Sequence, residues 1–295
     1  MFYRICLLIG LVSGFFPGSY AQIIKDFKVD EKHGFNLVQL DFNVYKGISD
    51  IKRKMMDPPV HIHSELSKVN ILPSFAYEIK DQVLYTSITH RNVESENLGK
   101  SLSHKLFSSA GDDYDHKWQV NLNSHFLYDL RFYFGIGAAN FDLSHLPISN
   151  CIIKSTSADI KLDYGNKFPN SVKMDTMRVS INMGSLEASN LNLTNAKEMI
   201  FESNYGSINL SFSVKMAESC NVQATVGAGK VELKLPDDSQ PYIVKIKSTA
   251  MCRTYVPKHL KDIGNKTYVS KSYQQNSGNL VTFNIDVSIG SVTLK

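Results

Sequence analysis

The feature that most constrains the fold of this chain is an internal repeat in its second half. In each copy a glycine or another small, turn-forming residue precedes a short apolar, polar, apolar triplet. The six copies are 137–143 (GAANFDL), 157–162 (SADIKL), 184–188 (GSLEA), 206–210 (GSINL), 227–233 (GAGKVEL) and 290–294 (GSVTL). A unit this short can bury its apolar edge only against its neighbours, so coils of about 20 to 25 residues predict a parallel β-helix or β-solenoid.

The register of the copies follows from their alignment. One apolar residue of each triplet falls at an equivalent inward position, namely Phe141, Ile160, Leu186, Ile208, Val231 and Val292. The next residue of a strand turns outward, so stacked copies should form a column from Asp142, Lys161, Glu187, Asn209, Glu232 and Thr293. Opposite charges attract across paired strands, which predicts that Lys161 lies between Asp142 and Glu187. A catalytic role for Asp142 and Glu187 is disfavoured, because an acid and a base need environments that separate their pKa values.

Period-two alternation extends the β prediction upstream of the repeat. Between residues 126 and 136 every even position is apolar, and Trp118, Val120 and Leu122 alternate with polar residues just before. Such alternation is typical of strands with one buried face. We therefore expect Trp118 in the core, with a stacked aromatic ligand site at 126–134 as the alternative interpretation. The whole chain is predicted to be all-β.

Residues 1–21 have the features of a secretory signal peptide. Arg4 precedes a short apolar run, and Ser19 and Ala21 provide the small residues of a cleavage site before Gln22. The run is shorter than the ~20 apolar residues that a membrane-spanning helix needs. We expect an exported mature chain that begins at Gln22, lacks a transmembrane segment and resides in the periplasm or at the cell surface.

The mature chain is predicted to have two parts. Residues 22–117 form a less regular β region that includes an exposed loop at 94–117, where Ser, Asp, Glu and Lys predominate. Residues 118–295 form the repeat domain, with a further coil near 242–247. A polar, irregular excursion is expected at 251–278.

Charge and cysteine content exclude two further classes of protein. The chain has 32 basic and 28 acidic residues spread along its length, so nucleic-acid binding is not expected. Signal cleavage leaves Cys151, Cys220 and Cys252, an odd number without a Cys-x-x-Cys pair, which predicts neither a disulfide framework nor a metal site. We expect three free thiols, because the coils that carry Cys151 and Cys220 should lie beyond disulfide reach.

No pattern identifies a catalytic residue, a cofactor or a metal centre. His61 and His63 would point to the same side of a strand, but no third ligand follows nearby in the sequence. The acidic run Asp112, Asp113 and Asp115 lacks the glycine and the distal glutamate of a calcium loop. The sequence therefore predicts a protein that is not an enzyme and that has no cofactor.

Three segments resemble one group of bacterial envelope proteins. Residues 130–165 (LRFYFGIGAANFDLSHLPISNCIIKSTSADIKLDYG) resemble the core of the adhesin-like LiaF-type or "toast-rack" families, with a strand, a glycine pair, a Leu-Pro connector and a second strand. Residues 191–212 are similar to the next coil, and residues 37–51 to a degenerate first coil. The resemblance implies a non-enzymatic module for adhesion, scaffolding or stress sensing, and it supplies no catalytic residues. This chain differs from LiaF-type proteins in that it has a predicted cleavable export signal where they have several membrane spans.

The excursion at 251–278 is the predicted recognition element, since irregular insertions can vary without unwinding a stack. It carries Arg253, Tyr255, Lys258, His259, Lys261, Lys266, Tyr268, Lys271 and Tyr273, a mixture suited to an anionic glycan or an envelope protein surface. A solvated loop is the competing interpretation. Two other functions remain open at this point: an envelope-stress sensor with a membrane partner, and a polysaccharide-acting β-helix enzyme.

Overall fold

The computed structural model describes residues 22–67, 72–91, 116–165, 168–213, 215–216 and 218–295. The predicted signal peptide and nearly all of the predicted loop at 94–117 lie outside the described residues.

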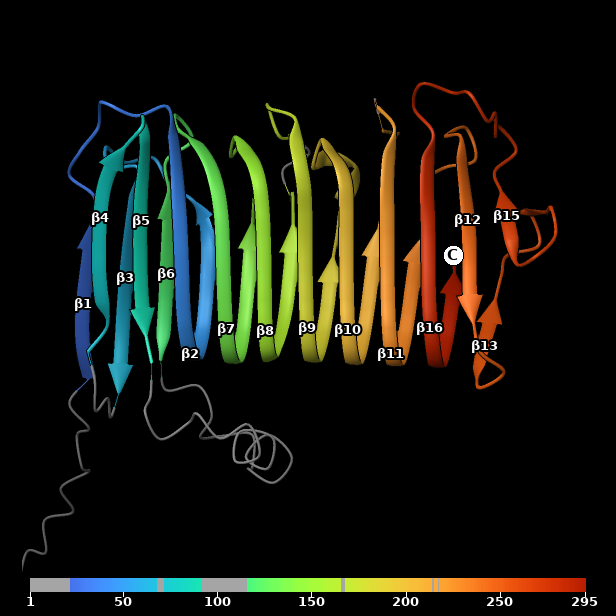
Figure 1. Ribbon diagram of the computed structural model, residues 1–295, viewed down its shortest axis with the longest axis horizontal. Helices are drawn as coiled ribbons and strands as arrows, with labels where there is room; N and C mark the ends of the chain where they lie inside the picture. The colour runs from blue at the N-terminus through green and yellow to red at the C-terminus, as the bar shows by residue number, and fades with distance from the viewer. Residues whose placement is uncertain (1–21, 68–71, 92–115, 166–167, 214, 217) are drawn as a thin grey trace, which may run out of the picture.

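Seven long strands form the body of the protein. They are β2 (Leu37–Arg53), β7 (Leu127–Asp142), β8 (Ile148–Asp163), β9 (Met174–Ala188), β10 (Ala196–Ser211), β11 (Cys220–Lys234) and β16 (Val281–Leu294), and each is parallel to the next in that order. Each strand folds back at the base of the molecule, so its two halves lie in two facing layers (Figure 1). The predicted all-β class is confirmed, with long parallel strands paired along the stack.

A glycine at the bend of most strands makes this close stacking sterically feasible. The six glycines at the bends all have positive φ: Gly47, Gly137, Gly184, Gly206, Gly229 and Gly290. The ladder pairs Gly47 with Gly137 and Gly137 with Ala158 of β8, and it pairs the last four glycines in succession. The backbone oxygen of Ala158 lies against Gly184 and joins the two groups into one column. At Gly229 φ is 149°, and an added Cβ would lie 1.7 Å from the backbone oxygen of Gly206. Only a residue without a side chain fits there.

The bend of β8 is different because Ala158 replaces glycine. The pairing of β8 with β9 stops after Ser157 and Met183 and resumes at Ile160 and Leu186. Asp159 compensates for part of this gap: its Oδ1 accepts hydrogen bonds from the backbone N (3.0 Å) and the Oγ (2.7 Å) of Ser185. A side-chain acceptor thus holds β9 where the backbone ladder is interrupted.

The structure corrects one copy of the predicted register. Ile160, Leu186, Ile208, Val231 and Val292 share one position of the ladder, as the alignment predicts. Phe141 does not, because Ala139 pairs with Ile160 and Phe141 pairs with Leu162. Ala139 and Phe141 both face the core. The sequence alignment selected the larger residue, Phe141, which lies two positions after the correct one, Ala139. Asp142 therefore lies beside Asp163, and Lys161 lies between Asn140 and Glu187.

We expect Lys161→Glu to destabilise the protein slightly. The change sets a carboxylate directly beside Glu187, and both side chains are exposed, so the loss should be about 0.5 kcal/mol and should shrink at high salt. Urea unfolding at low and high salt measures it, with Lys161→Gln as the control that removes the attraction and adds no repulsion. A loss independent of salt would contradict the register.

Shorter strands cover the N-terminal end of the stack, where the two that pair with β2 are parallel to it and the strands beyond them are antiparallel to their neighbours. In one layer β5 (Val83–His90) pairs with the first half of β2, and β4 (Ser74–Lys80) pairs with β5. In the other layer β6 (Lys117–Leu122) pairs with the second half of β2, followed by β3 (Val60–Ser67) and β1 (Gln22–Lys28). The segment that resembles a first coil thus forms β2, the first of the bent strands.

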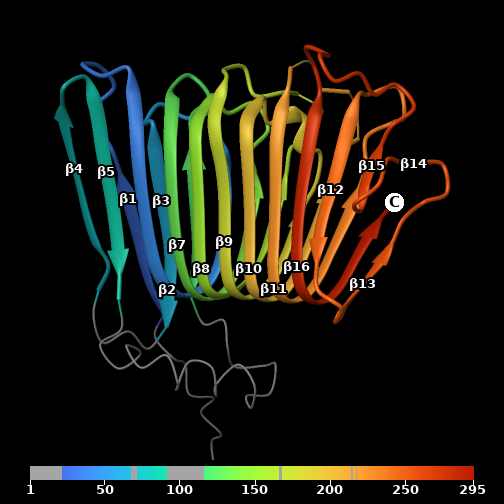
Figure 2. The same ribbon diagram turned by 45° about the vertical axis from the view of Figure 1, so that its right-hand side comes forward.

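The C-terminal end departs from the order of the sequence. β16 ends the chain, yet it lies between β11 and the pair formed by β12 (Tyr242–Ser248) and β13 (Cys252–Tyr255). β12 pairs with the first half of β16 and β13 with its second half, which makes one more bent unit. β15 (Thr267–Val269) pairs antiparallel with β12, and β14 (Lys261–Asp262) pairs with β15 (Figure 2).

The segment 251–278 is therefore more ordered than the sequence suggests. Its first residues complete the last unit, and β14 and β15 cover the edge of β12, whose backbone groups would otherwise lack partners. Leu260 and Val269 are buried on this edge. The segment is part of the end of the stack as well as an insertion.

The core runs continuously between the two layers. Trp118 is 1% exposed, and its ring meets that of Phe42 edge-on with the centroids 5.7 Å apart. Tyr128, Leu130, Phe132 and Phe134 are buried, which is the face that the alternation predicts. The structural interpretation of Trp118 and of this aromatic cluster is confirmed.

All three cysteines of the described chain are free thiols, and we expect them to react at different rates. Burial raises the pKa of both Cys151 and Cys220 to about 12, whereas Cys252 is partly exposed. Titration of the mature protein without reductant should return three thiols in denaturant, and in the native state Cys252 should react first. A single thiol in denaturant would contradict this prediction.

Candidate functional site

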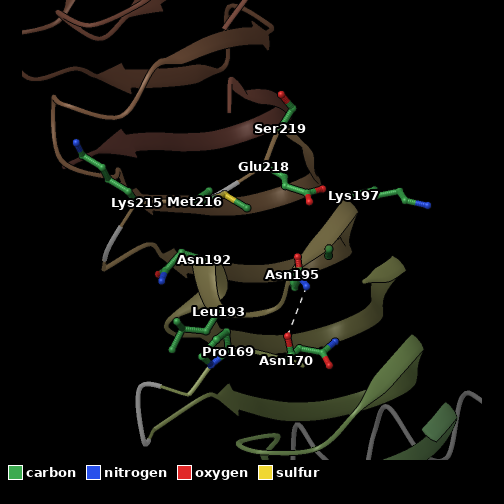
Figure 3. Close-up of a pocket in the computed structure, with 11 residues that line it drawn as sticks. Pro169, Asn170, Asn192, Leu193, Asn195, Lys197, Lys215, Met216, Glu218 and Ser219 are labelled. Atoms are coloured by element: carbon green, nitrogen blue, oxygen red, sulfur yellow. Dashed lines mark hydrogen bonds between the residues drawn. The ribbon is translucent and has the colours of Figure 1, made fainter. Parts of the chain in front are cut away.

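Loops at the top of successive units enclose a pocket of about 300 Å³, which we call the loop pocket (Figure 3). The residues that line it are Pro169, Asn170, Asn192, Leu193, Asn195, Ala196, Lys197, Lys215, Met216, Glu218 and Ser219. Ala196 and Lys197 begin β10, and the other lining residues belong to the connections before β9, β10 and β11, so the pocket arises where connections of neighbouring units meet.

The amides of the loop pocket mainly hold these loops together. Asn170 is 2% exposed; its Nδ2 donates to the carbonyl oxygens of Ile148 (2.7 Å) and Thr194 (3.1 Å), and its Oδ1 accepts from the backbone N of Ile148 (3.1 Å) and of Val172 (3.3 Å). Asn195, at φ 53°, donates to the carbonyl of Val172 at 3.1 Å. Both amides therefore have structural partners.

The charged groups of the loop pocket are largely neutralised by neighbours. Lys197 Nζ lies 2.5 Å from Asp175 Oδ1, and Glu218 Oε2 lies 2.7 Å from Lys173 Nζ. Asn192 is 8% exposed; its Oδ1 accepts from the backbone N of Ser213 at 2.8 Å, and its Nδ2 is left without a partner. The Asn192 amide is thus the donor of the pocket without a partner among the described residues, and Lys197 and Glu218 are each held in an ion pair with a residue outside the pocket lining.

The structure separates the nine residues predicted for recognition into several groups. Arg253 and Tyr255 lie on β13, and both are exposed. Lys258 and Lys261 are also exposed, Tyr268 packs partly against the core, and Tyr273 donates its backbone N–H to the carbonyl of Ser270. Only His259 and Lys271 converge on one partner.

That partner is Asp238, in a hollow of about 730 Å³ that we call the end hollow. Its Oδ1 lies 3.7 Å from His259 Nε2, and its Oδ2 lies 3.1 Å from Lys271 Nζ. Tyr242 donates its hydroxyl to Asp238 at 3.4 Å, and burial, followed by the charge of Asp238, raises the pKa of this tyrosine. The end hollow is lined by Glu232, Lys234, Leu235, Pro236, Asp237, Asp238, His259, Lys271 and Lys295, a set of mixed charge.

A second hollow of about 470 Å³ lies where β14 and β15 meet the outer face of the first layer, and we call it the face groove. Its lining residues are Gln223, Thr225, Lys245, Ile246, Lys247, Asn265, Thr267, Asn284, Ile285 and Asp286. Lys245 and Lys247 were not among the residues predicted for recognition, although the alternation of lysines with apolar residues in YIVKIKS indicates that both point outward.

Charged residues occur along the whole chain, but the excess of basic over acidic residues lies at this end of the protein. Residues 230–295 contain 10 Lys and Arg against 5 Asp and Glu, which leaves 22 basic and 23 acidic residues in 1–229. The last fifth of the chain therefore accounts for the whole net charge of +4. The end hollow lies within it, and so do all residues of the face groove except Gln223 and Thr225.

His61 and His63 lie on β3 and share the carboxylate of Asp26, and His63 Nε2 also lies 3.8 Å from Glu65 Oε1. His61 Nε2 and His63 Nδ1 lie 2.9 and 3.0 Å from the same Oδ1 of Asp26 on β1. The hydrogen bond from His63 is the main cause that lowers the pKa of Asp26. In the described ranges no group of three or more His, Cys, Asp or Glu residues is arranged to hold a metal ion. Asp112, Asp113 and Asp115 lie outside the described residues.

No family model and no curated protein sequence matches this chain. Similar solved structures include a candidate cell adhesion protein from Clostridium sporogenes, which is 15% identical over 93% of this chain and 99% of that chain with a TM-score of 0.47. Candidate adhesins from Bacteroides fragilis (12% identity, 93% and 97% coverage, TM-score 0.34) and Parabacteroides distasonis (10%, 94% and 98%, 0.35) are also similar. These values are too low to transfer a function. No helix among the described residues is long and apolar enough to cross a membrane.

Proposed function

We propose that this chain is an exported, non-enzymatic β-solenoid that binds or scaffolds at the bacterial cell envelope, as its resemblance to the LiaF-type or toast-rack families implies. One observation carries the proposal: the net positive charge is gathered at the C-terminal end, where irregular segments create two hollows. The bent strands supply a rigid support, because their backbone groups are used in pairing and their inner faces in the core.

The arrangement of charge supports binding rather than catalysis. On the outward column Lys161 lies between Asn140 and Glu187, so Asp142 and Glu187 do not form a carboxylate pair. In the end hollow Asp238 is held by His259 and Lys271, which suits electrostatic attraction of a partner more than proton transfer.

Binding to envelope material is the direct test. Mature protein from Gln22 onward is mixed with bacterial envelope preparations and sedimented, and the supernatant is assayed in parallel for released sugar. We expect binding that weakens with salt and no release of product. Product release would support the polysaccharide-acting enzyme, and absence of binding would contradict the proposal.

Point variants localise the surface better than a deletion does. Replacing 257–277 by a linker would remove Leu260 and Val269 and uncover the edge of β12, so it would disturb folding as well as binding. Arg253→Glu with Lys258→Glu changes only exposed side chains and should reduce envelope binding. The matched control reverses Lys25 and Lys28, two exposed lysines of β1 at the opposite end, and should bind as the wild type does.

A further inference from the structure

We propose that the face groove binds a polysaccharide that carries carboxylates, with Lys245, Lys247 and Lys266 receiving the acidic groups and a floor of amides and hydroxyls receiving the sugar hydroxyls. This inference deepens the proposed function and rests on it. It goes beyond the predicted recognition set, of which only Lys266 borders the groove.

The floor of the groove consists of side chains in two parallel rows. Gln223, Asn284 and Lys245 occupy one register position of β11, β16 and β12, and Thr225, Asp286 and Lys247 occupy the next outward position. Neighbouring strands are ~4.8 Å apart, so each row repeats at a spacing close to one sugar unit of an extended polysaccharide. A chain lying across the strands would meet one polar side chain per strand.

The floor of the groove has hydrogen-bonding atoms that are available to a ligand. Gln223 Nε2 donates to Glu198 Oε1 at 3.1 Å, and Asn284 Nδ2 donates to Asn221 Oδ1 at 2.9 Å. These bonds fix both amides and leave their carbonyl oxygens on the surface as acceptors for hydroxyl groups. Thr225 and Thr267 add hydroxyls at the two sides of the groove.

The cations of the groove exceed its acids. Lys247 pairs with Asp286 at 2.9 Å, and it keeps 84% of its side chain exposed. Lys245 is exposed and has no ion pair among the described residues, and Lys266 on the β14–β15 turn donates to Ser248 Oγ at 2.6 Å. Two lysines and one aspartate line the groove, and Lys266 lies in sequence between the lining residues Asn265 and Thr267. This excess of cations favours an anionic ligand, and the flexible lysine stems suit carboxylates spaced along a polymer.

The composition of the groove favours a glycan over other anions. Ile246 and Ile285 are buried, so the groove presents backbone and polar side chains instead of the apolar anchors that peptides and lipids use. Its lining contains no aromatic side chain on which bases could stack, as single-stranded nucleic acid requires. Sugar hydroxyls and uronate carboxylates match the groups that are present.

Polygalacturonate is the probe, because its methyl ester is the same chain without the charge. Titration calorimetry on mature protein compares the wild type, Lys245→Gln with Lys247→Gln, Lys266→Gln, and the control Lys25→Gln with Lys28→Gln. All five side-chain changes retain a polar group at an exposed site, and melting curves check the fold. We expect the groove double variant to weaken polygalacturonate binding at least about tenfold, Lys266→Gln to weaken it less, and the control to change nothing.

The outcomes separate this inference from the proposed function. Wild type that binds envelope material but not polygalacturonate would overturn the groove proposal and leave the proposed function standing. Equal affinity for polygalacturonate and its methyl ester, equal affinity for single-stranded DNA, or equal loss in the N-terminal control would also overturn the groove proposal. Absence of binding to envelope material would overturn the proposed function itself.

Discussion

Gly229→Ala should destabilise the protein by about 3 to 5 kcal/mol. At φ 149° an alanine is strained, and its Cβ would lie 1.7 Å from the backbone oxygen of Gly206. That oxygen belongs to the bend of β10, which is paired on both sides, so it cannot move without breaking the stack. Urea unfolding followed by circular dichroism measures the loss.

Gly278→Ala is the matched control. This glycine lies in the same C-terminal part of the chain, its φ is outside the left-handed range, and an added Cβ meets no atom within 4 Å. Its unfolding free energy should stay within about 0.5 kcal/mol of the wild type. Equal stability of the two variants would contradict the close approach of successive bends.

Asn170→Ala should cost a similar amount, about 3 to 5 kcal/mol. The change removes a side chain whose hydrogen bonds join the start of β8 to the connections before β9 and β10. It also leaves buried backbone groups of Ile148 and Thr194 without their hydrogen-bond partner. Thermal and urea unfolding measure the effect.

The control for this prediction is Asn182→Ala. Asn182 accepts one hydrogen bond from Asn204 at 2.8 Å on the outer surface, where water can replace it. We expect a loss below about 0.5 kcal/mol. If Asn170→Ala were as mild as this control, the loops would not be joined through the Asn170 amide.

Local patterning carries most of what the sequence predicts about the fold. The alternation around Phe132 is a short-range signal, and it corresponds to a buried strand face in the structure. The spacing of the triplets and of Gly206 and Gly229 is another, and it corresponds to bends that are aligned between strands. The register error at Phe141 arises because β7 has two inward residues after its glycine, Ala139 and Phe141, and hydrophobicity alone selects the larger.

Long-range pairing explains what the sequence could not predict. β16 is inserted between β11 and β12. The bends of β11 and β16, at Gly229 and Gly290, are therefore direct neighbours although they are 61 residues apart in the sequence. No local pattern encodes that insertion, because sequential strands are only usually adjacent. The same reordering brings Lys245 next to Asn284, which is why the face groove was missed while the cations of 251–278 were noticed.

The surroundings of His61 and His63 also depend on long-range strand pairing. The His-x-His pair is visible in the sequence, but its partner Asp26 lies on β1, an antiparallel neighbour 35 residues before His61. Pairing of distant strands, rather than spacing along the chain, determines what the two rings contact.

Lysine footprinting tests most directly the claim that binding resides at the C-terminal end of a rigid stack. Mature protein is acetylated briefly with and without polygalacturonate, and the modification of each lysine is read by mass spectrometry. We expect the ligand to protect Lys245, Lys247 and Lys266 and to leave the exposed Lys25, Lys28 and Lys161 unchanged. Protection spread evenly over the chain, or confined to the N-terminal lysines, would contradict it.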